Sequence, residues 1–453
     1  PAPAIPEGSA NAGGGAAARG GDGGGAGGRD AGGKNGAGPS GVGEGRPSDA
    51  TCGVGNSNSN GKASLPIRRE KDFVDTFFSN SRLHFIGSWK ANIDGVMSAA
   101  LALNKSPQPL PATECKVRQI IHVDIDCFFA SVATIVNPAL EGKPVAVCHS
   151  DHSNGTAEIS SANYEARKFG IKAGMFMSKA KELCPQLVRV PYYFEKYQEI
   201  SRALYRILLR FSAQVQPISV DEAFVDVSGL GDSMAICQEV RACFAKETGI
   251  TVSAGASHNM LLARIATKRA KPNGAFLVPS DAAEAFIGEL PVGEIPGVGY
   301  KFSKRLAEMH IHKCSDVWRH TRDHLQQSLG AKTGELIWEY AHGRDKRQVE
   351  AVRKRHSVGA EINWGIRFTT NDEAVKTLSR LSEEVEKRLR QNGKKGRCIA
   401  VKVKQRKANA PEPRKFMGHG WCENLSRSLT LACPTLAREV IAKEAVSLLL
   451  SLR

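Results

Sequence analysis

Two short acidic stretches, each set among apolar residues, constrain this chain more than any other feature. Residues 122–126 alternate apolar and polar side chains, with Asp124 among them, which predicts a strand with one buried face. Residues 218–226 hold Asp221 and Glu222 between Val, Ile and Phe, which predicts a strand or a tight turn between strands. An unpaired buried carboxylate is costly, and a divalent cation such as Mg²⁺ is the usual compensation. One such cluster alone could equally cap a turn or pair with a surface Lys, but two together favour a metal site.

The composition points to a nucleic-acid partner and to a reducing environment. The chain has 453 residues, a formal net charge of +16 and 11 Cys residues. The excess of positive charge favours an anionic partner, for which nucleic acid is the default. The cysteines are scattered and form no C-x-x-C pair, which argues against a disulfide framework or a zinc site and suits a nuclear or cytosolic protein.

Targeting and membrane signals are missing from the sequence. It contains no apolar run of about 18 residues, the length a membrane span needs, and no secretory signal precedes the expected fold. The first residue is Pro1 rather than Met, so we expect a piece of a longer protein.

The N-terminal part changes character near residue 66. Residues 1–65 are rich in Gly, Ala, Ser and Asn, a composition that buries too little apolar surface to offset chain entropy, so a disordered linker is predicted. Order should begin near Phe73. Residues 76–90 are aromatic and compact, and residues 91–114 predict a helix followed by a Pro-containing connector.

A cationic and hydroxyl-bearing group follows the first acidic stretch. Ser161, Tyr164 and Arg167 are three residues apart, so in a helix they would share roughly one face. Hydroxyl, phenol and guanidinium groups at a helix start can grip a phosphate. The alternative, an ordinary polar helix face, is favoured for this group taken alone.

Strands and helices alternate irregularly between residues 144 and 271, which predicts an α+β sheet domain. The expected strands are residues 144–148 and 251–256, and the expected helices are residues 193–212, 233–248 and 259–271.

Residues 281–345 are predicted to be helical and to contain a helix-hairpin-helix. Its turn holds Gly297 and Gly299, followed by Lys301. Such a turn exposes backbone N–H groups at a helix N-terminus, where a DNA phosphate can bind.

The last hundred residues predict a separate basic module. Residues 362–368, 399–407 and 425–431 are expected to be strands, and residues 371–391 and 434–452 helices. Lys402, Lys404 and Arg406 alternate with apolar residues, so one face can pack while the other meets phosphates. A solvated charge run is the alternative, but residues 351–453 carry most of the chain's positive excess.

These features together indicate nucleotidyl transfer on DNA, because carboxylate-held divalent metals suit that reaction. The sequence also resembles a known family, the Y-family translesion DNA polymerases, from about residue 116 to residue 453. Five stretches carry the resemblance, in the family's order: residues 124–131, 161–167, 219–224, 270–274 and 295–299.

The resemblance implies an α+β right-hand polymerase with several domains. It implies an N-terminal extension at 66–115, a palm at 116–135 and 196–278, fingers at 136–195, a thumb at 279–350 and a little finger at 351–453. It also implies the site residues. Asp124, Asp221, Glu222 and the Ile125 carbonyl would hold two Mg²⁺ ions, with Mn²⁺ as an alternative, and Phe128, Phe129, Ser161, Tyr164, Arg167 and Lys271 would bind the incoming nucleotide. Phe129 would be the steric gate against a ribose 2′-hydroxyl, and Asp126 would be the weaker acid because alternation points it away from Asp124.

Within the family, the deoxycytidyl transferase subgroup is most similar, on residues 81–84 with 89–90 and on residues 410–420. In that subgroup, an Arg equivalent to Arg82 pairs with incoming dCTP and a Leu equivalent to Leu83 fills the space of the evicted template guanine. Met417 and Gly418 would shelter that guanine. A guanidinium offers only donors, and the cytosine edge offers two adjacent acceptors, so the pairing selects C by roughly 1–3 kcal/mol.

The expected partners are primer-template DNA and dCTP, with other translesion polymerases and the sliding clamp recruited through regions outside this sequence. The expected location is the nucleus, with no membrane association. Two alternatives remain: a generalist bypass polymerase that reads the template base, and a non-catalytic DNA-binding scaffold.

Overall fold

The computed structural model describes residues 73–103, 105–111, 113–115, 117–150, 155–351, 355–415 and 418–452. The predicted linker at 1–65 lies outside these ranges. The described residues begin at Phe73.

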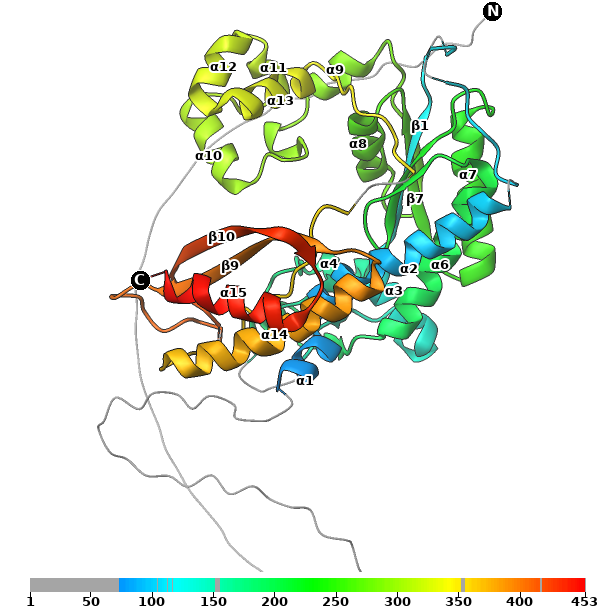
Figure 1. Ribbon diagram of the computed structural model, residues 1–453. Helices are drawn as coiled ribbons and strands as arrows, with labels where there is room; N and C mark the ends of the chain where they lie inside the picture. The colour runs from blue at the N-terminus through cyan, green and yellow to red at the C-terminus, as the bar shows by residue number, and fades with distance from the viewer. Residues whose placement is uncertain are drawn as a thin grey trace, which may run out of the picture. The chain divides into compact units, whose positions relative to one another are not determined.

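A five-stranded sheet in the order β5-β6-β1-β7-β8 carries the acidic stretches. Its strands are β1 (Ile120–Ile125), β5 (Val215–Pro217), β6 (Glu222–Asp226), β7 (Val252–Ser257) and β8 (Ala275–Leu277). Its helices are α6 (Phe194–Phe211), α7 (Ser233–Thr248) and α8 (Met260–Ala270). Figure 1 shows α8 on one face of this sheet and α6 with α7 on the other. Helices and strands therefore pack as layers of one domain, as the predicted α+β class requires.

The central strand, β1, is apolar because helices bury both of its faces and another strand pairs along each of its edges. Strand β1 pairs antiparallel with β6 and β7, and its Ile120, Ile121, Val123 and Ile125 are buried. Helix α8 lies so close to β7 that a Cβ on Gly255 would fall 2.1 Å from the Thr267 backbone nitrogen. Only glycine fits this contact, which brings the C-terminal end of α8 toward the acidic end of β1.

The N-terminal extension forms two helices, α1 (Phe73–Asn80) and α2 (Arg82–Ala102). On α2, Phe85, Trp89, Ile93 and Met97 repeat every four residues and are all buried, so one stripe of the helix faces a core. That core also contains Phe129 and Tyr197. The Trp89 indole Nε1 donates to the Ser201 hydroxyl on α6 at 2.8 Å, which fixes α2 against α6. The helix expected in the first part of residues 91–114 therefore begins earlier, at Arg82, and it ends at Ala102, before the Pro-containing connector.

A smaller three-stranded sheet follows in the order β3-β2-β4. The strands of this sheet are β2 (Val145–Val147), β3 (Ser161–Ala162) and β4 (Val188–Val190). The helices of the same segment are α3 (Phe128–Val136), η1 (Pro138–Leu140), α4 (Tyr164–Lys168) and α5 (Met177–Leu183). Ser161 lies on β3 and only Tyr164 and Arg167 lie on α4, so the prediction that the three residues share a helix face is wrong. The chain pairs briefly with β2 before it turns into the helix.

The helical segment contains α9 (Ala283–Gly288), η2 (Val292–Glu294), α10 (Tyr300–Glu308), α11 (Cys314–Val317), α12 (Arg322–Leu329) and α13 (Ala331–Ala341). Gly297 has φ +98° in the turn before α10, a conformation that favours glycine. Val298 is buried beside it, so the turn is anchored from within.

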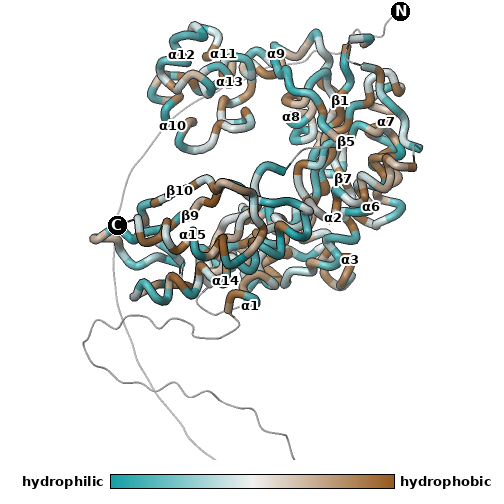
Figure 2. Tube along the Cα trace, in the orientation of Figure 1, coloured by the Kyte–Doolittle hydropathy of each residue, from teal (hydrophilic) through white to brown (hydrophobic). Residues whose placement is uncertain are grey.

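The C-terminal module pairs β9 (Gly396–Arg406) with β10 (Cys422–Thr435), and α14 (Asn371–Gln391) and α15 (Arg438–Leu450) pack on them. The α14 bounds match the prediction, and a capping box between Thr370 and Glu373 explains the start. The strand predicted at 362–368 is wrong, because that stretch forms only an isolated bridge from Trp364 to Gly418. Figure 2 shows brown, apolar segments where the two helices cover the hairpin.

Candidate active site

The fold brings the three predicted metal-binding acids to one end of the central sheet. Asp124 on β1 lies opposite Glu222 on β6 in the strand register. Asp221 occupies the turn between β5 and β6, and its carbonyl accepts a hydrogen bond from the Ile125 N–H at 2.9 Å. Two strands and one turn therefore place three carboxyl groups and the Ile125 backbone side by side.

A buried tyrosine supports this acidic turn. The Tyr205 hydroxyl on α6 lies 2.7 Å from the Ser219 carbonyl oxygen and 2.9 Å from that of Glu222. The Ser219 hydroxyl donates to the Asp221 carboxylate. Sequence reasoning missed Tyr205, because a tyrosine in an amphipathic helix gives no signal that its hydroxyl reaches a neighbouring turn.

Two cations hold the carboxylates in this structure. The Lys271 Nζ, just past α8, contacts Asp124. The Arg264 Nη2 on α8 donates to both oxygens of Glu222, at 2.8 and 3.1 Å. Arg264 was not among the predicted site residues, because the sequence does not tell which face of the helix expected at 259–271 meets the acids.

Burial dominates the electrostatics of the acids. Desolvation raises the pKa of Asp124 to about 7, although Lys271 opposes the shift. Desolvation also raises the pKa of Asp221 and of Glu222, against the opposing effects of Ser219 and Arg264 respectively. Burial thus makes the charged form of each carboxyl group unfavourable, and a bound cation would reduce this free-energy cost.

The donor set fits a magnesium ion by its chemistry. Carboxylates and a backbone carbonyl are the hard oxygen ligands that Mg²⁺ takes. Over the described residues, no three His, Cys, Asp or Glu side chains are already grouped as a metal would hold them. Binding an ion at these acids would therefore require Lys271 to leave Asp124, and Lys271 is itself predicted to bind the nucleotide phosphates.

Asp126 has a structural place away from the acid cluster. Its side chain is buried and accepts hydrogen bonds from the Thr251 hydroxyl at 2.9 Å, the Ser253 hydroxyl at 2.8 Å and the Asn273 N–H at 2.8 Å. The acid is therefore fully occupied in fixing β1 to β7 and to the turn after α8.

The predicted phosphate-binding residues gather around the turn that follows β1. Cys127 there has φ 39°, a left-handed conformation that reverses the chain into α3. The Ser161 hydroxyl lies 3.4 Å from the Cys127 carbonyl oxygen, and the Tyr164 hydroxyl lies 3.4 Å from an Asp126 oxygen. The Arg167 guanidinium lies over the Tyr164 ring at 4.7 Å. The group is thus assembled, although not by a shared helix face.

The predicted steric gate is firmly packed. Phe128 and Phe129 open α3, and both are buried. The Phe129 ring stacks on Tyr197 at 4.2 Å, with 15° between the planes, and the Phe85 ring of α2 lies 6.5 Å away. The gate position and the N-terminal extension therefore meet in one aromatic cluster.

Arg82 and Leu83 occupy the first turn of α2, one turn before Phe85. Ser81 caps the helix by accepting from the His84 N–H at 3.3 Å. Leu83 is 60% exposed, whereas the other large apolar residues of α2 are buried or half-buried. The Arg82 guanidinium makes no hydrogen bond or ion pair with the described residues. Both side chains are therefore available to a ligand.

Gly418 lines a cavity of about 790 Å³ together with Glu158, Trp364 and residues 411–415. Arg367 Nη2 donates to the Gly418 carbonyl at 3.1 Å. Met417, the other residue predicted to shelter a guanine, lies outside the described residues.

The predicted DNA-binding residues lie on two separate elements. Lys301 is exposed on α10, after the turn that holds Gly297 and Gly299. On β9, Val401 is buried while Lys402 and Lys404 are exposed, so the predicted division of faces is present. The Arg406 Nη1 lies 2.8 Å from Glu412, and the Lys404 Nζ lies 3.9 Å from Glu361.

Comparison with known protein families identifies the class. The model of the impB/mucB/samB family matches residues 123–268, and that of the family's C-terminal domain matches residues 355–453. A model described as the DNA polymerase-iota thumb domain matches residues 293–345. DNA polymerase IV of Alkalilimnicola ehrlichii is 38% identical over 291 residues, which is 63% of this chain and 81% of that protein. The chain belongs to the impB/mucB/samB family, the Y-family DNA polymerases.

Within that family, the sequence is similar to eukaryotic proteins named DNA repair protein REV1. The Arabidopsis thaliana protein is 43% identical over 388 residues, which is 83% of this chain and 35% of that protein. The Drosophila melanogaster protein is 33% identical over 435 residues, covering 82% of this chain and 44% of that protein. The chain thus spans less than half the length of these relatives.

A solved structure supports the same fold. A chimera of the Y-family DNA polymerases Dbh and Dpo4 superposes with a TM-score of 0.62 at 26% identity, covering 74% of this chain and 93% of that chain. The predicted right-hand polymerase fold is therefore confirmed. In the described part of the chain, no helix combines the length and apolarity that crossing a membrane demands.

Proposed function

We propose that this protein performs translesion DNA synthesis by transferring dCMP from dCTP to a primer end, with Arg82 in place of a template base. The observation that carries the proposal is the pair Arg82 and exposed Leu83 on a helix whose next turn packs against Phe129. A donor fork and an apolar wedge thus stand beside the predicted gate of the nucleotide site. The similarity to REV1 proteins supports the same reading.

The arginine fork accounts for selection of cytosine. A guanidinium presents parallel N–H donors and no acceptor, and among the Watson–Crick edges of the four bases only that of cytosine offers two adjacent acceptors for them. A bidentate contact of this kind discriminates by roughly 1–3 kcal/mol, which is about 10- to 200-fold. Arg82 has no competing acceptor among the described residues, so no internal bond has to break first.

The three acids account for the transfer step. When bound there, two Mg²⁺ ions would activate the primer oxygen and neutralise the triphosphate. Asp124, Asp221 and Glu222 would hold the ions, with the Ile125 carbonyl, and Lys271 would turn from Asp124 to the phosphates. Ser161, Tyr164 and Arg167 would grip the same phosphates, and Phe128 and Phe129 would bound the sugar.

Eviction of the template guanine requires a wedge and a shelter. Unstacking a base costs a few kcal/mol. Leu83 would fill the vacated space, and the cavity beside Gly418, with Met417, would hold the displaced base. The volume of that cavity, about 790 Å³, supports this role.

Primer-template DNA would be held through Gly297, Gly299 and Lys301 on one side and Lys402, Lys404 and Arg406 on the other. We further propose that the protein acts in the nucleus and that regions outside this sequence bring other translesion polymerases and the sliding clamp. The partly covered length of its relatives leaves room for such regions.

Single-nucleotide insertion with four template bases and four dNTPs tests this function. The proposal expects dCTP to be preferred opposite every template base and opposite an abasic site. A generalist polymerase would instead change nucleotide with the template. Asp221→Asn is the control: it should lower insertion by about a thousandfold, since metal-held charge stabilises the transition state by several kcal/mol. Unchanged activity in that variant would point to a non-catalytic scaffold.

A further inference from the structure

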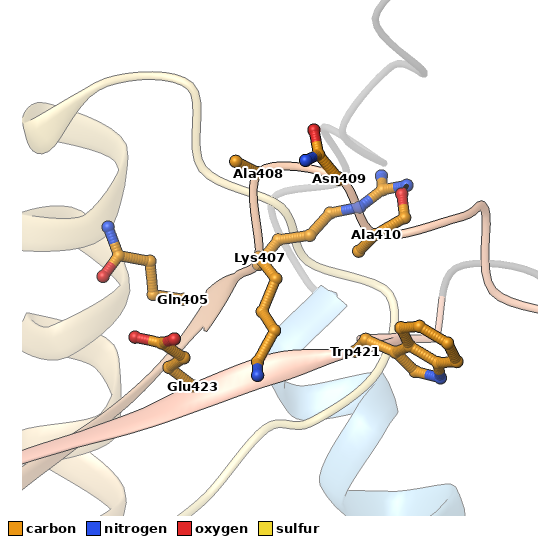
Figure 3. A pocket seen from close by; sticks show the side chains of 8 residues that line it. Gln405, Lys407, Ala408, Asn409, Ala410, Trp421 and Glu423 are labelled. Carbon is orange, nitrogen blue, oxygen red and sulfur yellow. Dashed lines mark hydrogen bonds between the residues drawn. The ribbon is translucent and has the colours of Figure 1, made fainter.

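An exposed tryptophan marks the loop that joins β9 to β10. Trp421 is 68% exposed, the second highest exposure among the large apolar residues of the described part. It lies opposite Lys407, whose N–H donates to the Trp421 carbonyl at 3.1 Å. Figure 3 shows the Lys407 and Trp421 side chains leaving the strand ends, with Ala408, Asn409 and Ala410 arching over them. We call Lys407, Asn409 and Trp421 the hairpin platform.

The hairpin platform is held in place by the loop around it. Arg406 donates to Glu412 at 2.8 Å and to the Ala410 carbonyl at 2.9 Å. The Ala410 N–H donates to the Lys407 carbonyl at 3.0 Å. Gly420, with φ +67°, turns the chain just before Trp421. The indole therefore projects from a braced turn and not from a loose tail.

Open space borders the indole on two sides. A cavity of about 620 Å³ is lined by Arg406, Lys407, Asn409, Trp421 and Glu423, with neighbours on the same loop. Trp421 also borders the cavity beside Gly418, which we assign above to the displaced guanine. Trp421 thus lines both cavities.

The chemistry of this surface matches a single-stranded nucleotide. Every base has a π-face that stacks on an exposed aromatic ring, and cations beside the ring attract the backbone. Lys407, just past the end of β9, has no hydrogen bond to another side chain or ion pair in the described residues. An apolar protein partner would favour a wider patch of apolar residues, whereas the first cavity presents Gln405, Arg406, Lys407, Asn409 and Glu423 beside Trp421.

We propose that Trp421 stacks on an unpaired template nucleotide on the 5′ side of the templating position, with Lys407 contacting its phosphate. This site rests on the proposed function, because the neighbouring cavity is the one assigned to the displaced guanine. The platform would guide the single-stranded template past that cavity and limit its freedom there.

Binding to three matched primer-templates tests the platform. The first has a single-stranded 5′ template extension, the second has the same extension made of abasic nucleotides, and the third ends at the templating base. Fluorescence anisotropy measures the Kd of each for the wild type, Trp421→Ala and Trp421→Phe. We expect Trp421→Ala to weaken binding of the first by about tenfold, Trp421→Phe to weaken it by less than about threefold, and neither to change the others. The wild type should bind the substrate with the abasic extension as weakly as Trp421→Ala binds the substrate with the intact extension.

A second readout follows the indole directly. An oligonucleotide of the extension should quench the tryptophan fluorescence of the wild type, and Trp421→Phe should lose most of that quenching. If Trp421→Ala weakens binding of all three primer-templates equally, Trp421 has a structural role or a role in holding the guanine. If it weakens binding of none, there is no nucleotide site at Trp421. Either result overturns the proposal. Because no nucleotide is inserted, these results are independent of dCTP preference, so failure of the platform and failure of the proposed function remain distinguishable.

Discussion

Leu83 is exposed, whereas Trp89 on the same helix is buried. The effect of Leu83 on the reaction can therefore be separated from an effect on stability. Leu83 is 60% exposed, so Leu83→Ala should change the free energy of unfolding by no more than about 0.5 kcal/mol. It should nevertheless lower kcat/KM for dCTP opposite template guanine by about tenfold, because the wedge that offsets unstacking is shortened. Opposite an abasic site no base has to be displaced, and the rate should hold. Equal losses on both templates would contradict the wedge.

Phe129 is predicted to exclude ribonucleotides. Phe129→Ala should raise the ratio of CTP to dCTP insertion by at least about tenfold, since the ring no longer fills the space of a 2′-hydroxyl. The variant also loses the stack on Tyr197, which should cost about 3–5 kcal/mol of stability. The ratio is measured within one variant and is therefore insensitive to that loss. An unchanged ratio would remove Phe129 as the gate.

Asp124 should make the stability depend on pH and on magnesium. Between its ordinary pKa of 3.8 and about 7, the folded protein keeps a proton that the unfolded chain has released. The free energy of unfolding should therefore fall as the pH rises through this window. Mg²⁺ should raise Tm strongly at about pH 8 and weakly at about pH 5, where protons compete for the carboxylates.

Two variants separate this effect from general charge effects. Asp124→Asn should be more stable than the wild type at about pH 8 without Mg²⁺, and the difference should shrink at about pH 5. Glu239→Gln, an acid-to-amide change at an exposed position on α7, should behave like the wild type. A magnesium response of equal size in wild type and Asp124→Asn would contradict metal binding at this acid.

At the scale of elements, the basic face of β9 should govern DNA affinity. Lys402 and Lys404 are exposed while Val401 is buried, so the cations face away from the α14–α15 layer. Replacing both by Gln should lower the slope of log Kd against log salt by roughly 1–2, because fewer counterions are released. Lys246→Gln, at an exposed position on α7, is the matched control and should leave the slope unchanged. An unaltered slope in the double variant would place the contacts elsewhere.

The elements that could be predicted from sequence are those with local signals. The bounds of α14 follow from its charge pattern and from the capping box at Thr370, and α7 follows from its Asp232 N-cap. The stretch 362–368 has a strand pattern but no strand partner beyond one bridge, and a partner is a long-range property. Ser161 likewise depends on pairing with β2, which the spacing of Ser161, Tyr164 and Arg167 does not reveal.

At the scale of the molecule, the site is assembled from segments far apart in sequence. β1 provides Asp124, the β5–β6 turn provides Asp221, and the end of α8 provides Lys271. Their identities could be predicted from motifs, but the Tyr205 support, the Arg264 contact with Glu222 and the packing of Phe85 near Phe129 required coordinates. Motifs thus predict which residues form the site, whereas helix faces and strand register determine what those residues touch.

The central claim is that Arg82 selects the nucleotide. The most direct measurement is kcat/KM for each of the four dNTPs opposite an abasic site, in the wild type, Arg82→Ala and Arg82→Lys. We predict that the wild type prefers dCTP by at least about tenfold, that Arg82→Ala loses this preference while transfer continues at a reduced rate, and that Arg82→Lys, which lacks the fork, recovers little of it. An Arg82→Ala variant that still prefers dCTP opposite the abasic site would contradict the account.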